Sequence, residues 1–247
     1  MKLEFKKDAL LNGINIVSKA IPSRTTMSIL ECILIDADAG EIKLTGNDME
    51  LGIETKVEGS ILERGKIALE AKLFYEIIRK LPDGDTPVTI TSDNRFNTVI
   101  ECENAVFNIQ GRDGEEFSYL PYIERDQHIS LTQFTLKEAI RQTIFSISPN
   151  DSNKMMAGEL LEVKDDFLKV VSLDGHRISI RNIQLKEHYD NHKVIVPGKT
   201  LSEISKILTG DNEKEVLIYF SKNHILFEFD DTVVVSRLID GEYFKID

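Results

Sequence analysis

The chain has 247 residues, 41% of them hydrophobic, and a formal net charge of −12 at pH 7. This length allows one large domain or two of ordinary size. No apolar run approaches the roughly 18 residues of a membrane-spanning helix, and residues 1–7 carry charges where a signal peptide has its apolar stretch. We therefore expect a cytoplasmic protein without a membrane partner.

The two cysteines, Cys32 and Cys102, lie in apolar stretches and lack the spacing of a metal-ligand set. We expect two small buried side chains and no metal site. The negative net charge by itself disfavours a protein that neutralises many phosphates. The distribution of charge along the chain is more informative than its sum.

The first half of the chain is predicted to run helix, strands, helix, strands. Leu10, Ile14, Val17 and Ile21 recur at spacings of four, three and four, which places them on one face of a helix over 6–20. A second helix is predicted over 71–81. Stretches rich in apolar and β-branched residues predict strands at 41–44, 88–91 and 98–102.

The second half repeats this order. Helices are predicted over 136–147 and 198–209, and strands at 167–171, 216–220 and 225–229. Thr135 with Glu138, and Thr200 with Glu203, have the spacing of a capping box at the start of these helices.

Matching motifs indicate that the two halves are copies of one unit. Asp113-Gly114-Glu115 and Asp240-Gly241-Glu242 are 240 − 113 = 127 residues apart. Ala9 and Ala139, Asp48 and Asp174, and Ser92 and Ser221 follow in the same order, at offsets of 130, 126 and 129. Small changes in offset are what loop insertions produce, and units of ~120 residues are too long for solenoid repeats.

The sequence therefore predicts an α+β fold with two tandem domains, each with two helices backed by antiparallel sheets. We expect the domains to cover 1–122 and 128–247. The boundary is expected near 118–127, a polar and charged stretch that contains Pro121.

Positive charge is concentrated in the predicted helices. They contain ten basic residues, namely Lys6, Lys7, Lys19, Lys72, Arg79, Lys80, Lys137, Arg141, Lys199 and Lys206. Their acidic residues are Asp8, Glu76, Glu138 and Glu203, so the helices carry +6 and the rest of the chain −12 − 6 = −18. If the helices share one face, that face attracts phosphate. The alternative is that lysine is simply a good helix former on solvated faces.

No motif for reading bases is present, and the chain lacks Trp. Any contact with DNA is therefore expected to be with the backbone and indifferent to sequence.

Asp174-Gly175-His176-Arg177 is the most suggestive short motif. Asp and His close together suggest acid–base or metal chemistry. The first copy has Asn47-Asp48-Met49-Glu50 at the same place, so the shared aspartate is predicted to stabilise a turn. His176 and Arg177 occur only in the second copy, where partner binding, a structural use and catalysis remain open.

Two other function classes compete with DNA binding. A metal-dependent hydrolase would use Asp48, Asp174 and His176, and it requires these carboxylates to converge on a metal. A protein-binding scaffold without a DNA role is the third alternative.

An ordered set of motifs along the whole chain resembles the bacterial DNA sliding clamp, the beta subunit of DNA polymerase III. These motifs are Ser28-Ile29-Leu30, residues 44–50, Asp174-Gly175-His176-Arg177, residues 194–199 and Leu238-Ile239-Asp240-Gly241. The resemblance implies a ring-forming homodimer of three-domain subunits in the full-length form, with helices lining a hole around double-stranded DNA. It implies a processivity factor in DNA replication, a non-catalytic accessory subunit of the polymerase with no cofactor. We expect the third clamp domain to be absent from this chain, which alone does not close a ring.

The resemblance also implies roles for particular residues. It assigns DNA contact to Arg24, Lys72, Arg79 and Lys199. Half of a pocket for short peptides of the polymerase catalytic subunit and the clamp loader is assigned to Met156, Leu173, Gly175, His176, Arg177, Ile178 and Phe244. Phe107 and Ile109 are expected on an exposed edge at the subunit interface. The chain departs from the family at Asn153, where arginine is frequent, and at Phe244, where proline is frequent.

Overall fold

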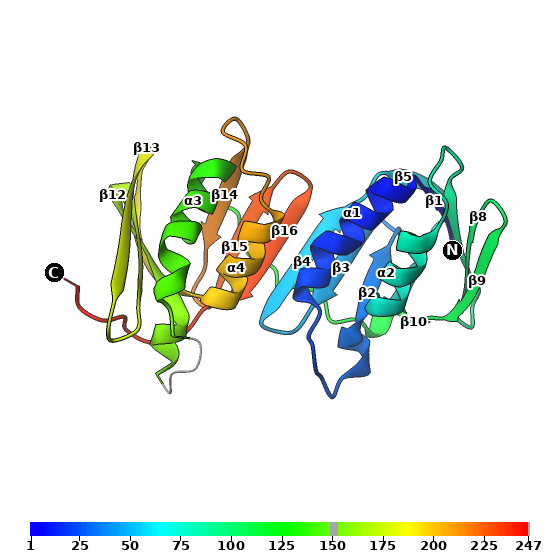
Figure 1. The fold of residues 1–247 in the computed structure, drawn as a ribbon, viewed down its shortest axis with the longest axis horizontal. Coiled ribbons are helices and arrows are strands. Elements are labelled where there is room, and N and C mark those ends of the chain that lie inside the picture. Colours follow the sequence, from blue (N-terminus) through cyan, green and yellow to red (C-terminus); the bar gives the residue numbers. More distant parts are fainter. Residues whose placement is uncertain (149–152, 247) are drawn as a thin grey trace. The chain divides into compact units, whose positions relative to one another are not determined.

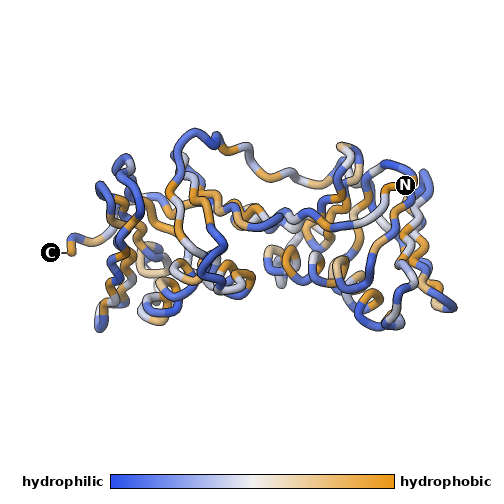
Figure 2. The backbone as a smooth tube through the Cα atoms, turned by 90° about the horizontal axis from the view of Figure 1, so that it is seen from above, coloured by the Kyte–Doolittle hydropathy of each residue, from blue (hydrophilic) through white to orange (hydrophobic). Residues whose placement is uncertain are grey.

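The computed structural model describes residues 1–148 and 153–246, and the chain divides into two compact units, Met1–Leu120 and Pro121–Asp247 (Figure 1). Within the described residues, each unit contains two α-helices and mostly antiparallel strands, which confirms the predicted α+β class. Hydrophobic stretches coincide with the helices and strands, and hydrophilic residues with many of the turns (Figure 2). Among the described residues, no helix has the length and apolar character needed to span a membrane.

In the first unit, helices α1 (Lys7–Val17) and α2 (Ala71–Lys80) lie side by side and pack on strands (Figure 1). One antiparallel sheet has the order β5-β1-β7-β8-β9, and the other strands follow the order β10-β6-β2-β3-β4. The strands are β1 (Lys2–Phe5), β2 (Cys32–Asp36), β3 (Lys43–Asn47), β4 (Leu51–Lys56), β5 (Gly59–Glu63), β6 (Lys66–Glu70), β7 (Val88–Ser92), β8 (Asn97–Cys102), β9 (Ala105–Gln110) and β10 (Arg112–Asp113).

The second unit repeats this plan with α3 (Gln133–Thr143) and α4 (Gly198–Ile207) side by side. Strands β11 (His128–Thr132), β14 (Glu215–Phe220), β15 (His224–Phe229) and β16 (Thr232–Arg237) pair in the order β11-β14-β15-β16. Strands β12 (Gly158–Leu173) and β13 (Ile178–Pro197) form a long antiparallel hairpin.

The apolar faces predicted for the helices are buried. Leu10, Ile14 and Val17 of α1 have no exposed surface, and Leu201 and Ile204 of α4 are buried in the same way. Burying large aliphatic side chains contributes roughly 1.5–3 kcal/mol each. Helix position is therefore set by packing against the sheets.

Both predicted capping boxes are wrong. The N-cap of α3 is Thr132, whose hydroxyl accepts a hydrogen bond from the N–H of Thr135 at 3.1 Å. In α4 the hydroxyl of Thr200 is buried and lies 2.6 Å from the hydroxyl of Ser236. The reason is that β11 and β13 run directly into α3 and α4, so each helix begins before the predicted box.

A lysine in the first helix of each unit holds the end of the second helix. Lys7 Nζ donates to the carbonyl oxygen of Leu81 at 2.6 Å, and Lys137 Nζ donates to that of Leu208 at 2.7 Å. The last carbonyls of a helix lack intrahelical donors, and an ammonium group there also compensates the helix dipole. Two of the ten basic residues therefore stabilise the helix pairs.

The second unit buries a carboxyl group. Glu159 of β12 has no exposed surface, and its Oε2 lies 3.1 Å from Thr143 Oγ1, while Oε1 has no hydrogen-bond partner among the described residues. The single hydroxyl proton of Thr143 is accepted by the Ala139 carbonyl at 2.8 Å, so a protonated carboxyl can act as the donor to Thr143. Burial raises the pKa of Glu159 to about 8, which keeps the group mostly neutral at neutral pH.

Lys137→Met removes the ammonium group that caps α4. We expect the free energy of unfolding to fall by about 1.5–3 kcal/mol, the size of a hydrogen bond to a charged group. Lys206→Met is a matched control, because the exposed Lys206 pairs with Glu203 of its own helix, and its loss should stay within about 0.5 kcal/mol. Urea titrations followed by circular dichroism measure both variants, and equal losses would contradict the capping role.

Glu159→Gln should remove a pH dependence of stability. The carboxyl titrates at about 8 when folded and at its ordinary value of 4.5 when unfolded. Between these values the folded state holds a proton that the unfolded state has released, so the free energy of unfolding falls as pH rises.

Glutamine keeps a donor for Thr143 and does not ionise. Urea titrations from pH 5 to 9 should therefore show a stability advantage of Glu159→Gln that grows to the order of 3–5 kcal/mol above the folded pKa. The same pH slope in both proteins would mean that another group is responsible.

Candidate nucleic-acid and partner interfaces

The helix pair of the first unit presents exposed basic side chains. Lys72 and Arg79 are exposed on α2, and their spacing of seven residues places them on one side of the helix. Lys72 and Lys19 line a cavity of ≈ 410 Å³ between α1 and α2. Arg24 is exposed in the segment that follows the 3₁₀ helix Ser18–Ala20.

Arg79 is held along its helix. Its guanidinium lies 2.7 Å from Glu76 Oε2, with the carbon of the group 5.9 Å from the centre of the Tyr75 ring. The hydrogen bond from Arg79 holds the pKa of Glu76 below its ordinary value. Such an exposed pair is worth little in stability, so it leaves Arg79 available to an approaching anion.

In the second unit, Lys199 is exposed in the first turn of α4. Arg141 of α3 makes two hydrogen bonds to Glu138, at 2.8 and 2.7 Å, and Lys206 pairs with Glu203 at 2.8 Å. The helix acids thus pair with bases of their own helix. The excess of basic residues remains, because α1 with α2 and α3 with α4 each contain four basic and two acidic residues, a net charge of +2 in an acidic chain.

The aspartate shared by the two copies stabilises the same turn in each. Asp48 Oδ1 accepts hydrogen bonds from the N–H groups of Glu50 and Leu51, at 3.0 and 2.6 Å. Asp174 Oδ1 accepts from those of His176 and Arg177, at 3.1 and 3.2 Å. These donors, and the Arg177 side chain with them, hold the pKa of Asp174 below its ordinary value. The predicted structural role of the aspartate accounts for its presence in both copies.

The central residue of this turn differs between the copies. Gly175 has φ of 83° and Met49, at the equivalent position, has φ of 74°. Both values lie in the left-handed region that favours glycine. The first copy therefore holds an exposed methionine in a strained conformation where the second holds glycine.

An apolar cluster lies beside the second turn. Leu173 and Phe244 pack against a buried group of Leu160, Val171, Ile195 and Tyr243. Ile178 follows the turn with its side chain 49% exposed. The structure thus brings Leu173 and Phe244 together and places Gly175, His176, Arg177 and Ile178 next to Leu173 along the chain.

Met156 lies in the 3₁₀ helix Lys154–Ala157, and its neighbour Met155 packs on this cluster. Asn153 caps that helix, since its side-chain oxygen accepts from the N–H of Met155 at 3.0 Å. His176 is exposed. Arg177 pairs with Asp174 at 2.8 Å and lies over the exposed ring of Phe145, 5.9 Å from its centre.

Sequence reasoning missed three residues of this region. Met155 packs on the cluster, Phe145 supports Arg177, and Tyr243 is the buried aromatic. Tyr243 donates its hydroxyl hydrogen bond to the Val171 carbonyl at 3.3 Å, and burial raises its pKa to about 12. Tyr243 directly follows the repeated motif Asp240-Gly241-Glu242, and this position could have identified it from the sequence.

Strand β9 forms one edge of its sheet. The expected exposure of Phe107 and Ile109 is wrong, because both are half-buried. They pair with Ile100 and Thr98, which are buried, and neighbours across a sheet share a face. Val106, which points to the other face, is 53% exposed.

The hydrolase alternative finds no support in the described part of the chain. It contains no group of three or more His, Cys, Asp or Glu side chains that could hold a metal ion. Asp48 and Asp174 each accept hydrogen bonds from their own turn.

Family models match both units. One described as the DNA polymerase III beta subunit, N-terminal domain, matches residues 1–121, and one described as the central domain of that subunit matches residues 130–245. The chain is 36% identical over 251 residues to the beta sliding clamp of Staphylococcus epidermidis, and the alignment includes 98% of this chain. This chain spans 66% of that relative, slightly less than two thirds of the relative's length.

Solved structures agree with these matches. The chain is 65% identical to a putative DNA polymerase III beta subunit from Eubacterium rectale, with a TM-score of 0.96 over 99% of this chain and 67% of that one. It is 34% identical to the DNA polymerase sliding clamp from Bacillus subtilis, with a TM-score of 0.94 over 99% of this chain and 66% of that one. This chain therefore belongs to the family of DNA polymerase III beta subunits, the bacterial sliding clamps.

Proposed function

We propose that this chain supplies two domains, 1–122 and 128–247, of a clamp that encircles duplex DNA and tethers the replicative polymerase. The observation that carries the proposal is the duplicated helix pair with a net positive charge, in a chain of net charge −12. Such a clamp increases processivity without catalysing a reaction. A subunit with a third domain, paired head to tail with a second copy, would close the ring.

The proposed DNA contact is with phosphates. Arg24, Lys72, Arg79 and Lys199 are exposed, and lysine and arginine bind the DNA backbone without reading the bases. Weak contacts of this kind leave a protein able to slide, because binding is equally favourable at every register. The acidic remainder of the chain repels phosphate, so contact is limited to the helix pairs.

The proposed partner surface is the turn at Asp174 with the cluster around Leu173 and Phe244. An exposed Ile178 and half-buried Met156, Leu173 and Phe244 provide apolar contact, while His176 and Arg177 provide polar groups. This chemistry suits a short peptide with apolar anchors, such as a segment of the polymerase catalytic subunit or the clamp loader. Phe107 and Ile109 of the edge strand β9 are proposed to lie at the subunit interface.

Substituting Lys72 and Lys199 together by methionine tests the DNA contact. Each lysine that neutralises one phosphate contributes about 0.9 to the slope of log affinity against log salt. The double variant should lower that slope by about 2, equally on duplexes of unrelated sequence. Fluorescence anisotropy with labelled duplexes at several salt concentrations measures this.

Lys186→Met is the matched control, because Lys186 lies on β13 and pairs with Glu215 at 2.8 Å. Its salt slope should equal that of the parent. A double variant with an unchanged slope, or a loss confined to one DNA sequence, would contradict the proposed contact.

Ile178→Glu tests the partner surface. A buried charge in an apolar contact should weaken peptide binding at least about tenfold. Met49→Glu is the control, since Met49 lies in the equivalent turn of the first unit and is similarly exposed, 54% against 49%. Labelled overlapping peptides that cover the polymerase catalytic subunit provide the probes, and binding that is equally sensitive to both substitutions would argue against this site.

A further inference from the structure

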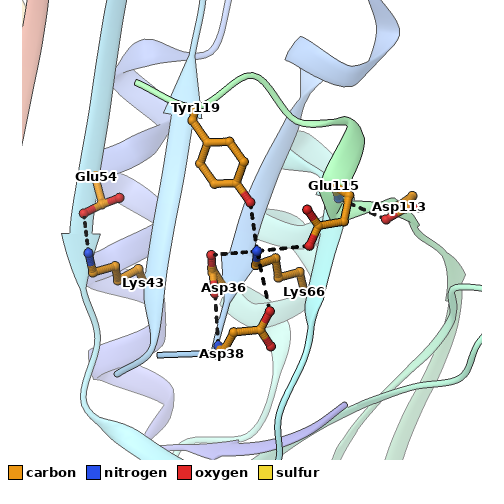
Figure 3. Close-up of polar contacts among 8 residues, drawn as sticks. All are labelled: Asp36, Asp38, Lys43, Glu54, Lys66, Asp113, Glu115 and Tyr119. Atoms are coloured by element: carbon orange, nitrogen blue, oxygen red, sulfur yellow. Dashed lines mark hydrogen bonds and ion pairs between the residues drawn. The ribbon is translucent and has the colours of Figure 1, made fainter. Parts of the chain in front are cut away.

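A lysine cluster ties the end of the first unit to its sheet. Lys66 Nζ lies 3.0 Å from both Glu115 Oε1 and Tyr119 Oη, 3.5 Å from Asp38 Oδ2 and 3.8 Å from Asp36 Oδ2 (Figure 3). The Lys66 side chain is only 18% exposed. The hydrogen bonds to Tyr119 and Glu115 raise the pKa of Lys66. The ammonium group of Lys66 on β6 thus holds residues 115–119 against the sheet through Glu115 and Tyr119.

The second unit has a lysine, Lys193, at the position equivalent to Lys66. Lys66 stands 71 − 66 = 5 residues before α2 and Lys193 stands 198 − 193 = 5 residues before α4. The backbone pairing also repeats, because Arg112 pairs with Ala68 and the N–H of Ile239 donates to the Ile195 carbonyl at 2.9 Å. Both of these pairs are related by an offset of 127. At this offset Glu242 corresponds to Glu115, and Ile246 to Tyr119.

The cluster is open in the second unit. Lys193 Nζ lies 3.8 Å from Glu162 Oε1, and the described residues form no Lys193–Glu242 ion pair within 4.0 Å. Between them is a cavity of ≈ 700 Å³, which we call the Lys193 pocket. Its basic lining residues are Lys193, Lys222, Arg237 and Lys245, against two acids, Asp240 and Glu242. The pocket therefore carries local positive charge where the first unit has a filled acidic cluster.

We propose that the Lys193 pocket docks an acidic segment of a partner polypeptide. Its carboxylates would fill the place that Glu115 takes beside Lys66. The first unit supplies the template, since there the occupant is an acidic polypeptide segment with aromatic side chains, residues 115–119. The half-buried Leu238 and Ile239 line the same pocket and provide apolar contact next to the charges. A peptide uses both kinds of lining, whereas a small inorganic anion uses only the charges.

The Lys193 pocket adjoins the partner surface at the Asp174 turn, because Leu160, Ile195 and Tyr243 of the buried cluster also line the pocket. Its lining contains neither the residues of that turn nor Phe244. The inference rests on the internal repeat and on charge, and it does not depend on the DNA contact proposed above.

The test measures whether the segment that contacts Lys66 in the first unit binds, as a free peptide, to the second unit. The probe is the peptide Glu-Glu-Phe-Ser-Tyr, residues 115–119 of this chain, acetylated and amidated. Titration into the ¹⁵N-labelled 247-residue chain should give saturable amide shifts around Asn223, Ile239 and Gly241. Lys193→Met and Lys222→Met should each weaken binding about tenfold, as expected for one lost charge-assisted contact.

Lys164→Met is the matched control, an exposed lysine on the same hairpin, and it should leave affinity unchanged. The peptide Gln-Gln-Phe-Ser-Tyr should bind at least about tenfold more weakly. Thermal unfolding checks that each variant remains folded. Shifts that persist in both lysine variants, an equally strong glutamine peptide, or equal binding of inorganic phosphate at the same sites would each overturn the proposal.

Discussion

The arrangement of each unit depends on a half-buried lysine that joins its two helices. Lys7 reaches the last turn of α2 and Lys137 reaches that of α4, at 2.6 and 2.7 Å from the terminal carbonyl oxygens. The contact joins the start of one helix to the end of the other, so it fixes both their spacing and their direction. The two helices of each unit therefore lie side by side, with exposed basic residues on α2 and α4.

The sequence was sufficient for features that depend on neighbours along the chain. The helical face of Leu10, Ile14 and Val17, the repeat and the turn at Asp174 all follow from local spacing, and the structure has them. The lysine caps could not be predicted, because their acceptors lie 74 and 71 residues away. The capping boxes were wrong for a related reason. Strands β11 and β13 lead straight into α3 and α4, so the N-cap residue of each helix is the last residue of the preceding strand. The roles assigned to the exposed bases and the Asp174 turn remain predictions.

The repeat does not correctly predict which aromatic residue after the Asp-Gly-Glu motif is buried in the second unit. Phe117 is buried against Cys32, Leu34 and Ala68 in the first unit. At the offset of 127 its counterpart is Phe244, yet the buried residue is Tyr243. A shift of one residue in an extended segment turns a side chain to the opposite face. Phe244 is consequently left half-buried beside Leu173, on the proposed partner surface.

A comparison of the two copies distinguishes residues that the fold requires from residues that only one copy has. Asp48 and Asp174 accept from backbone N–H groups of the same turn, and Lys7 and Lys137 donate to the same helix end, so folding alone explains these contacts. Glu159 does not fit that pattern: the ladder pairs Glu159 with Val196 and Ile33 with Leu69, so the first copy has a buried isoleucine where the second has a buried carboxyl. The same contrast distinguishes Lys66, enclosed by acids, from Lys193, which faces an open pocket. Since the first copy folds with the alternative in each case, the fold does not require the residue of the second, and these positions are where function specific to the second unit should be sought.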